Sequence, residues 1–225
     1  MANVNNLLLL PFLQGLSNEE LLQIAGRVRF HFQSRSEREI IARQDSPCKG
    51  LIYVTSGEIA QIRRGDGGDY TLTEWFSAPY LVQPEALYGF RTRYSHTFIA
   101  ASDVRLLEIS KEDVRDTLIH YDAFRIGLLN YLSYAVQRTT SSLWRIAKSD
   151  IPSRFAHFLL QRSTRPAGRK QLNIRRSELA ECLNTTKRQL VPVLTELEEK
   201  GLIETTRGKI EIPAFEKLLA YISQN

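Results

Sequence analysis

Residues 176–212 decide the fold, and their sequence is RSELAECLNTTKRQLVPVLTELEEKGLIETTRGKIEI. Apolar side chains recur at helical spacing over 176–183, and Asn184 is a residue type that often ends a helix. A second helix is expected from Thr186, because Thr-Lys-Arg-Gln is a capping box, and Gly201 is its expected end. Two helices with so short a connection predict a helix-turn-helix.

The segment after this helix pair alternates between apolar and polar residues, as half-buried strands do. We expect strands at 202–205 and 209–212, joined by a turn at Thr206-Arg207-Gly208. A hairpin directly after a helix-turn-helix is a wing. The C-terminal third is therefore predicted to be a winged helix.

The amino end of the second helix carries residues suited to DNA recognition, since this end enters the major groove in helix-turn-helix proteins. Lys187 and Arg188 suit guanine acceptors and Gln189 suits adenine, each good pair contributing about 1–3 kcal/mol of discrimination. Basic residues on the first helix and the wing suit phosphate contacts. The predicted DNA-binding residues are Arg176, Thr186, Lys187, Arg188, Gln189, Arg207 and Lys209.

The charge of the chain is uneven in a way that agrees with this prediction. Residues 151–225 hold 13 Lys and Arg against 8 Asp and Glu, whereas residues 1–150 hold 17 of each. A basic module joined to a neutral one indicates that the C-terminal part meets a polyanion.

Pro192 conflicts with the predicted recognition helix. As its sixth residue it removes the hydrogen bond to the Arg188 carbonyl and should bend the helix. Either the helix is kinked, or it begins later than Thr186.

Residues 30–109 have a different texture, with short apolar or alternating runs separated by turn signals such as Gly65-Asp66-Gly67-Gly68. This pattern predicts an antiparallel β-barrel or jelly roll, a fold that often surrounds a ligand pocket. Before it, Ser17 and Glu20 form a capping box that predicts a helix over 17–28. The expected strands are 30–32, 39–42, 51–54, 58–63, 70–76, 97–100 and 104–109.

A long helix is expected over 122–148, and its apolar and small residues form a seam with 4-3-4-3-4 spacing. Such an a/d seam predicts pairing with a second helix in a homodimer, where small side chains allow close approach. A second stripe holds Leu129, Val136 and Leu143, so one stripe can pack on the barrel and the other on the partner. The alternative is one wide buried face inside a monomer. The predicted dimer residues are Leu128, Leu132, Ala135, Thr139, Ser142 and Ile146.

A break at Ser149-Asp150-Ile151-Pro152 follows this helix. Asp150 can cap a new helix, and Pro152 fits its first turn. The predicted fold class is α+β, with an N-terminal antiparallel β-barrel or jelly roll, a long dimerisation helix and a C-terminal winged helix-turn-helix. The predicted domains are a sensor β-barrel over 1–121, the dimerisation helix over 122–149 and the DNA-binding domain over 150–225.

These features together resemble the CRP/FNR superfamily of bacterial transcription regulators over nearly the whole chain. Residues 51–59, Leu-Ile-Tyr-Val-Thr-Ser-Gly-Glu-Ile, match a strand pair of the family's sensor domain, which binds cyclic nucleotides in some members. Asp150, with the Arg-Phe pair four residues later, matches the helix after the hinge. Residues 174–203 match the helix-turn-helix, and Gly208-Lys209 matches the wing tip.

This resemblance implies a homodimer on a double-stranded operator whose two-fold related half-sites lie about 34 Å apart. It also implies RNA polymerase as a partner. A small-molecule effector in the sensor barrel would shift an equilibrium between two arrangements of the DNA-binding domains.

The region that binds the phosphate in cyclic-nucleotide-binding members departs from the family. Those members have roughly Phe-Gly-Glu-x-Ala-Leu followed by Arg-Ser or Arg-Thr, whereas residues 82–87 here are Val-Gln-Pro-Glu-Ala-Leu. Gln83 stands in the Gly place and Pro84 in the Glu place, so cyclic AMP is not the expected effector, although Thr139 and Thr140 match base-contacting positions. A pocket of another specificity is predicted from Glu85, Arg91, Arg93, Ser95, His96, Thr139 and Thr140.

The cofactor is left open by the sequence. Cys48 and Cys182 lie far apart, so an iron–sulfur cluster, a structural zinc site and a disulfide framework are not expected. Haem stays open as an alternative, with four histidines to consider as ligands, although packed or surface positions are commoner for each of them. These are His31, His96, His120 and His157.

Other functions and locations were weighed against the regulator. No catalytic or metal-binding constellation is found at a convincing spacing, so an enzyme is not expected. The alternative function is a nucleotide-binding regulatory adaptor that acts on a protein partner. The apolar run 7–13 is too short to span a bilayer and is expected to pack on the first domain, so we expect a cytoplasmic protein with no membrane partner.

Overall fold

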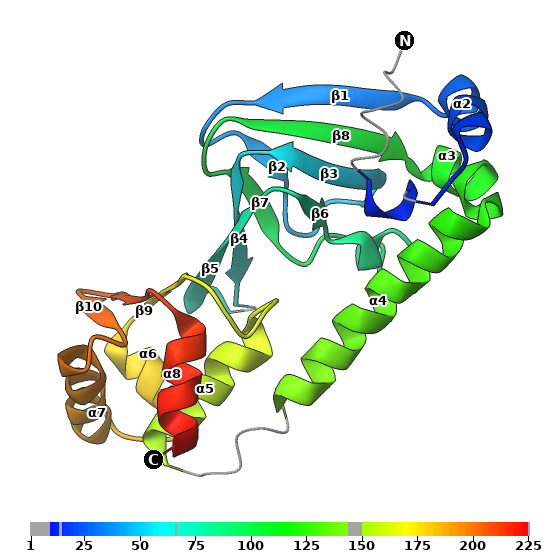
Figure 1. The fold of residues 1–225 in the computed structure, drawn as a ribbon. Coiled ribbons are helices and arrows are strands. Elements are labelled where there is room, and N and C mark those ends of the chain that lie inside the picture. Colours follow the sequence, from blue (N-terminus) through cyan, green and yellow to red (C-terminus); the bar gives the residue numbers. More distant parts are fainter. Residues whose placement is uncertain (1–9, 14, 66, 144–149, 225) are drawn as a thin grey trace. The chain divides into compact units, whose positions relative to one another are not determined.

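The computed structural model describes residues 10–13, 15–65, 67–143 and 150–224, without the side chains of residues 11 and 138–143. The chain forms two compact units, coloured along the sequence in Figure 1. One contains residues up to Ala60 together with Phe76–Val136. The second contains Gln61–Trp75 and everything described from Gln137 onward.

The first unit is built on antiparallel strands, as the alternating sequence runs predicted. Its four-stranded sheet has the order β1-β8-β3-β6, and β2 pairs with β7. Each of the seven expected strands is present, and only the three-residue β6 was missed. The strands are β1 (Phe30–Arg35), β2 (Ile40–Ala42), β3 (Gly50–Ser56), β4 (Glu58–Arg64), β5 (Tyr70–Ser77), β6 (Tyr80–Val82), β7 (Thr97–Ala100) and β8 (Val104–Ser110), with β4 and β5 crossing into the second unit.

Helices close the core of the first unit. Ser17 caps α2 with the predicted capping box. Phe12 packs edge to face on Phe124, with ring centroids 5.9 Å apart, and the described part of the run 7–13 is buried in the core, as expected. The helices are η1 (Pro11–Leu13), α2 (Asn18–Arg27), η2 (Pro84–Ala86), α3 (Lys111–Asp116), η3 (Leu118–His120) and α4 (Asp122–Leu143).

Helix α4 shows which of its two stripes faces inward. Leu128 is 5% exposed in the core of the first unit, and Leu132 packs against that core. Leu129 and Val136 are instead 54% and 65% exposed. The predicted seam therefore begins as a core contact, and Leu128 cannot serve as an exposed dimer residue because its side chain is already buried. Ile146, and the side chains of Thr139 and Ser142, lie outside the described residues.

The second unit contains the predicted winged helix. The Asp150 side chain accepts a hydrogen bond from the Ser153 N–H at 2.7 Å and caps α5, with Pro152 in the first turn as expected. The elements are α5 (Ile151–Arg162), β9 (Lys170–Ile174), α6 (Arg176–Cys182), α7 (Lys187–Glu199), β10 (Glu204–Thr206), β11 (Lys209–Ile212) and α8 (Phe215–Gln224).

Two of these elements were not predicted. Strand β9 pairs with β11 of the wing and with β5. Helix α8 buries Phe215, Leu218 and Ile222 in the core of this unit. The strand order in this unit is β10-β11-β9-β5-β4, so residues 61–75 extend the sheet of the winged helix by two strands.

Helix α7 begins at Lys187, with Thr186 as its N-cap, and continues through Pro192 to Glu199. The helix therefore begins where the capping box predicts, which excludes the alternative of a later start. Its interior proline has no N–H to donate to the Arg188 carbonyl. The buried residues Leu190, Leu194 and Leu197 hold the helix in place on both sides of the proline.

Replacing this proline should make the protein more stable. Pro192→Ala restores a helical hydrogen bond, and proline is about 3 kcal/mol less favourable than alanine in a helix interior. Loss of the proline's rigidity in the unfolded chain opposes this by about 0.4–1 kcal/mol. Denaturant unfolding should show a net gain of about 2 kcal/mol, and Thr195→Ala on the same exposed helix surface should show only a fraction of it. An unchanged or lower unfolding free energy for Pro192→Ala would contradict this view of α7.

Candidate nucleic-acid interface

The recognition helix is oriented by the burial of its apolar side. Leu190, Leu194 and Leu197 are between 0% and 2% exposed. This anchoring turns the first turn of α7 to solvent, where Lys187 and Arg188 are both exposed. Within the described part of the chain neither side chain forms an ion pair, so both charges are available to an approaching polyanion.

Gln189 completes the predicted capping box of α7. Its side-chain oxygen accepts hydrogen bonds from the hydroxyls of Thr186 and Thr185 at 3.0 and 3.1 Å. The Thr186 hydroxyl in turn accepts from the Gln189 N–H at 3.3 Å. This cap contributes about 1 kcal/mol to helix stability. Gln189 must release its amide oxygen from the cap before that oxygen and the amide NH2 can both pair with adenine, so Lys187 and Arg188 are the better candidates for direct base contact.

The turn between α6 and α7 is held by a residue of α5. Asn184 adopts a left-handed backbone conformation with φ of 47°, as suits a residue that ends a helix. The Arg154 guanidinium donates to the Asn184 carbonyl oxygen at 2.9 Å. This contact fixes the turn from which the exposed end of α7 projects.

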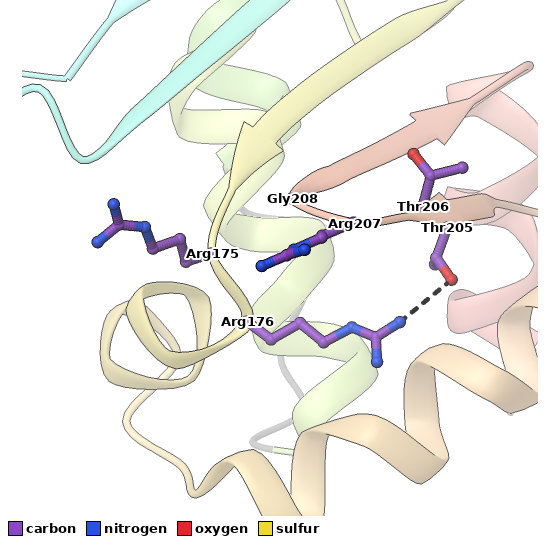
Figure 2. Close-up of a pocket in the computed structure, with 6 residues that line it drawn as sticks. All are labelled: Arg175, Arg176, Thr205, Thr206, Arg207 and Gly208. Carbon is purple, nitrogen blue, oxygen red and sulfur yellow. Dashed lines mark hydrogen bonds between the residues drawn. The ribbon is translucent and has the colours of Figure 1, made fainter.

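Three arginines border a cleft between the start of α6 and the wing, shown in Figure 2. The cleft has a volume of about 550 Å³ and is lined by Arg175, Arg176 and the wing residues 205–208. The Arg176 guanidinium donates to the Thr205 hydroxyl at 3.5 Å. Three guanidinium groups around an open cleft suit phosphate oxygens.

Arg175 was missing from the predicted DNA-binding set. Its side chain is 82% exposed and lies 3.6 Å from the Glu178 carboxylate. The sequence signal was its position beside Arg176, but the unpredicted strand β9 hid the fact that both residues stand at a strand-to-helix junction. Arg176 and Arg207 were predicted, and the structure brings them together with Arg175.

Lys209 is less available than predicted. Its ammonium group pairs with the Glu211 carboxylate on the same strand, and Arg169 approaches that carboxylate at 3.4 Å. The hydrogen bond from Lys209 lowers the pKa of Glu211. Because Glu211 offsets its charge, Lys209 adds less to phosphate attraction than Arg207, which is exposed at the wing turn.

Several predicted effector residues of the first unit are already held by internal contacts. Gln83, in the place of the family's glycine, has a left-handed φ of 39°. Its side-chain oxygen accepts the Ser95 N–H at 3.0 Å, and the Ser95 hydroxyl lies 2.7 Å from His96 Nδ1. An incoming phosphate would have to displace the Gln83 side chain from this N–H group.

The arginines of this region are also occupied. Arg93 donates to the Asp45 carbonyl oxygen, and Arg91 lies 3.3 Å from the Asp45 carboxylate. Glu85 is exposed. Thr139 and Thr140 belong to α4, and their side chains lie outside the described residues.

A separate hollow of about 460 Å³ opens elsewhere in the first unit. Among its lining residues are His31, Lys49, Tyr94 and Glu108. Burial raises the pKa of the Tyr94 hydroxyl, with a hydrogen bond to Cys48 adding to the shift. None of the predicted effector residues with a described side chain lines this hollow.

In the residues that the structure describes, no group of three or more His, Cys, Asp and Glu side chains is placed to hold a metal ion. The His157 ring is engaged with Gln161 at 2.7 Å. The same described residues include no helix long and apolar enough to cross a membrane.

Two family models match the chain and together cover most of its length. The cyclic nucleotide-binding domain matches residues 32–121, and the Crp-like helix-turn-helix domain matches residues 153–221. The chain therefore belongs to the CRP/FNR family of transcription regulators, in which a DNA-binding helix-turn-helix is joined to an effector-binding domain. Such regulators act by binding and not by catalysis, in agreement with the sequence analysis.

Solved structures show the same fold. The catabolite activator protein of Thermus thermophilus is 22% identical, with a TM-score of 0.53 over 96% of this chain and 99% of that one. A putative crp/fnr regulator of Eubacterium rectale is 20% identical, with a TM-score of 0.53 over 96% of this chain and 99% of that one. The c-di-GMP responsive global regulator CLP of Xanthomonas campestris is 23% identical, with a TM-score of 0.51 over 88% of this chain and 99% of that one. No curated protein matches the chain.

The cleft predicts a specific dependence of DNA affinity on salt. Arg175→Ala, Arg176→Ala or Arg207→Ala should each weaken binding to duplexes of any sequence and reduce the slope of log K against log salt by about 0.9, because one phosphate contact is lost. Fluorescence anisotropy with a labelled duplex over a salt series measures this slope. Arg38→Ala, in the first unit with an 89% exposed side chain, is the matched control and should change nothing. If the salt slopes of the three cleft variants equal the slope of Arg38→Ala, the cleft does not contact phosphate.

Proposed function

We propose that this protein is a homodimeric regulator that recognises a two-fold DNA operator and is controlled by a small molecule bound in its first unit. The observation that carries the proposal is the exposed first turn of α7, with Lys187 and Arg188 on the same unit as the arginine cleft. The first turn of α7 can select bases, and the arginine cleft can hold the phosphate backbone of the DNA. Its place of action would be the cytoplasm, with RNA polymerase as a further partner.

Recognition divides between these two groups of residues. Lys187 and Arg188 enter the major groove and donate to guanine N7 and O6. Arg175, Arg176 and Arg207 grip the phosphates beside the groove and set the register without selecting sequence. The wing and the start of α6 border one cleft, and both belong to the same unit as α7. Phosphate contacts in the cleft would therefore orient α7 on the duplex independently of its base contacts.

The dimer would form along the exposed side of α4. Ile126, Leu129 and Val136 are between 51% and 65% exposed, and Ser133 continues their 3-4-3 spacing. This spacing is that of a coiled-coil seam, and pairing with a second copy would bury the apolar stripe. The predicted residues Leu132 and Ala135 flank it, while Leu128 stays in the core.

The effector would differ from cyclic AMP. Gln83 already satisfies the Ser95 N–H, and Arg93 is held by the turn at Asp45. A ligand of this region must therefore compete with internal hydrogen bonds. Glu85, His96 and the two threonines of α4 remain the proposed contacts for such a ligand.

Direct readout can be tested by competition between an operator and a scrambled duplex. Lys187→Ala or Arg188→Ala should lose about 1–3 kcal/mol of discrimination between the two, since each side chain supplies one base contact. The operator is first selected from random duplexes by the wild-type protein. Lys217→Ala, which removes an exposed charge from α8 of the same unit, should keep full discrimination. If the helix variants discriminate as well as Lys217→Ala, α7 does not read the bases.

A further inference from the structure

The sheet of the winged helix is extended by a hairpin from elsewhere in the sequence. Strand β5 pairs antiparallel with β9, from Tyr70 opposite Ile174 to Glu74 opposite Lys170. Residues 61–75 fall within the cyclic nucleotide-binding match, whereas β9 falls within the helix-turn-helix match. Residues 61–75, called the hairpin below, thus come from the sensor part of the sequence but belong to the DNA-binding unit.

A buried ion pair joins the two strands. Lys170 Nζ lies 2.5 Å from Glu74 Oε1, and the two side chains are 0% and 3% exposed. The other carboxylate oxygen of Glu74 accepts the Thr164 N–H at 2.7 Å. Burial lowers the pKa of Lys170, and the charge of Glu74 opposes that shift.

Three arginines between residues 162 and 169 also contact the hairpin. Arg162 Nε donates to the Tyr70 hydroxyl at 3.0 Å, and Arg165 donates to the Trp75 carbonyl oxygen at 2.7 Å. The Arg169 guanidinium lies 4.3 Å from the centre of the Trp75 ring. With Lys170, four cationic side chains between 162 and 170 are thus engaged by residues 70–75.

These contacts suit a joint that can open. A buried ion pair is worth little net stability, because separated charges regain their hydration when the strands part. Parting of the strands would expose one edge of β9, whose sequence is Lys-Gln-Leu-Asn-Ile. Lysine is common on exposed edge strands, where its charge opposes pairing with another strand. The apolar part of the joint is small, with Tyr70 and Leu72 contributing to the core of the unit.

The charges indicate how the joint would affect DNA binding. Asp69, at the end of the hairpin turn, is close enough to α6 to raise the pKa of Cys182, although burial of the thiol is the larger cause. A carboxylate near the helix-turn-helix repels phosphates. Residues 61–75 hold three acidic residues against two arginines, so the paired hairpin adds a formal charge of −1 to the DNA-binding unit and contacts four of its cationic side chains.

We propose that the 61–75 hairpin is an autoinhibitory latch: paired with β9 it opposes operator binding, and its release raises DNA affinity. This inference rests on the proposed function. It also names the route of regulation, because β4 and β5 run on into the first unit at Ala60 and Phe76. An effector that shifts these strands changes the population of the paired state.

A disulfide across the latch tests this directly in the full-length protein. Thr71 and Asn173 are register partners, and Asn173 Nδ2 donates to the Thr71 hydroxyl at 3.1 Å. Thr71→Cys with Asn173→Cys, in a Cys182→Ser background, should close the latch when oxidised. The selected operator duplex should bind about tenfold more weakly to the oxidised form than to the reduced form, within the usual range of coupling between sites. The control pair is Ser34→Cys with Arg105→Cys, which are partners on β1 and β8, and its affinity should not depend on oxidation.

The outcomes separate the latch from the proposed function. Equal or tighter operator binding by the oxidised latch variant, while the reduced form binds specifically, would overturn the latch alone. No specific binding by wild type or by either form would overturn the proposed function, and the latch with it. As a second arm without cysteines, Glu74→Leu with Lys170→Met replaces the ion pair by apolar contacts that favour the paired state. It should weaken operator binding while thermal unfolding confirms a folded chain, and unchanged affinity would count against the latch.

Discussion

The burial of one side of α7 is the constraint on which the account depends. Three leucines of this helix are almost fully buried, and each contributes about 1.5–3 kcal/mol by leaving water. The helix therefore cannot rotate about its axis without exposing them. Its other side, with Lys187 and Arg188 in the first turn, is forced into solvent. The same burial keeps α7 in place despite the hydrogen bond that Pro192 lacks.

Strand β9 links recognition to regulation because both of its edges are used. One edge pairs with β11 of the wing, and the other pairs with β5 of the hairpin. The strand also leads directly into Arg175 and Arg176, which border the phosphate cleft. A change in the hairpin thus acts on a strand that is one residue away from the DNA-binding surface. In the proposed regulation, β9 alone connects the hairpin to the DNA-binding surface.

Much of the fold could be predicted because its signals are local. The capping boxes at Ser17 and Thr186, the N-cap at Asp150 and the wing turn at Gly208 are short patterns whose geometry the structure confirms. The pairing of β9 with β5 could not be predicted, since it joins residues about a hundred positions apart through a strand with little apolar character. The ion pair between Lys209 and Glu211 was also not predicted, because it depends on side-chain geometry and not on residue type.

In the proposed dimer, two copies of α7 present their first turns to one operator. Hydroxyl-radical footprinting of the selected operator measures this arrangement. We expect two protected half-sites on one face of the duplex, separated by about one helical turn of roughly 34 Å. A single protected half-site, or even protection along the whole duplex, would show that α7 does not bind as a pair.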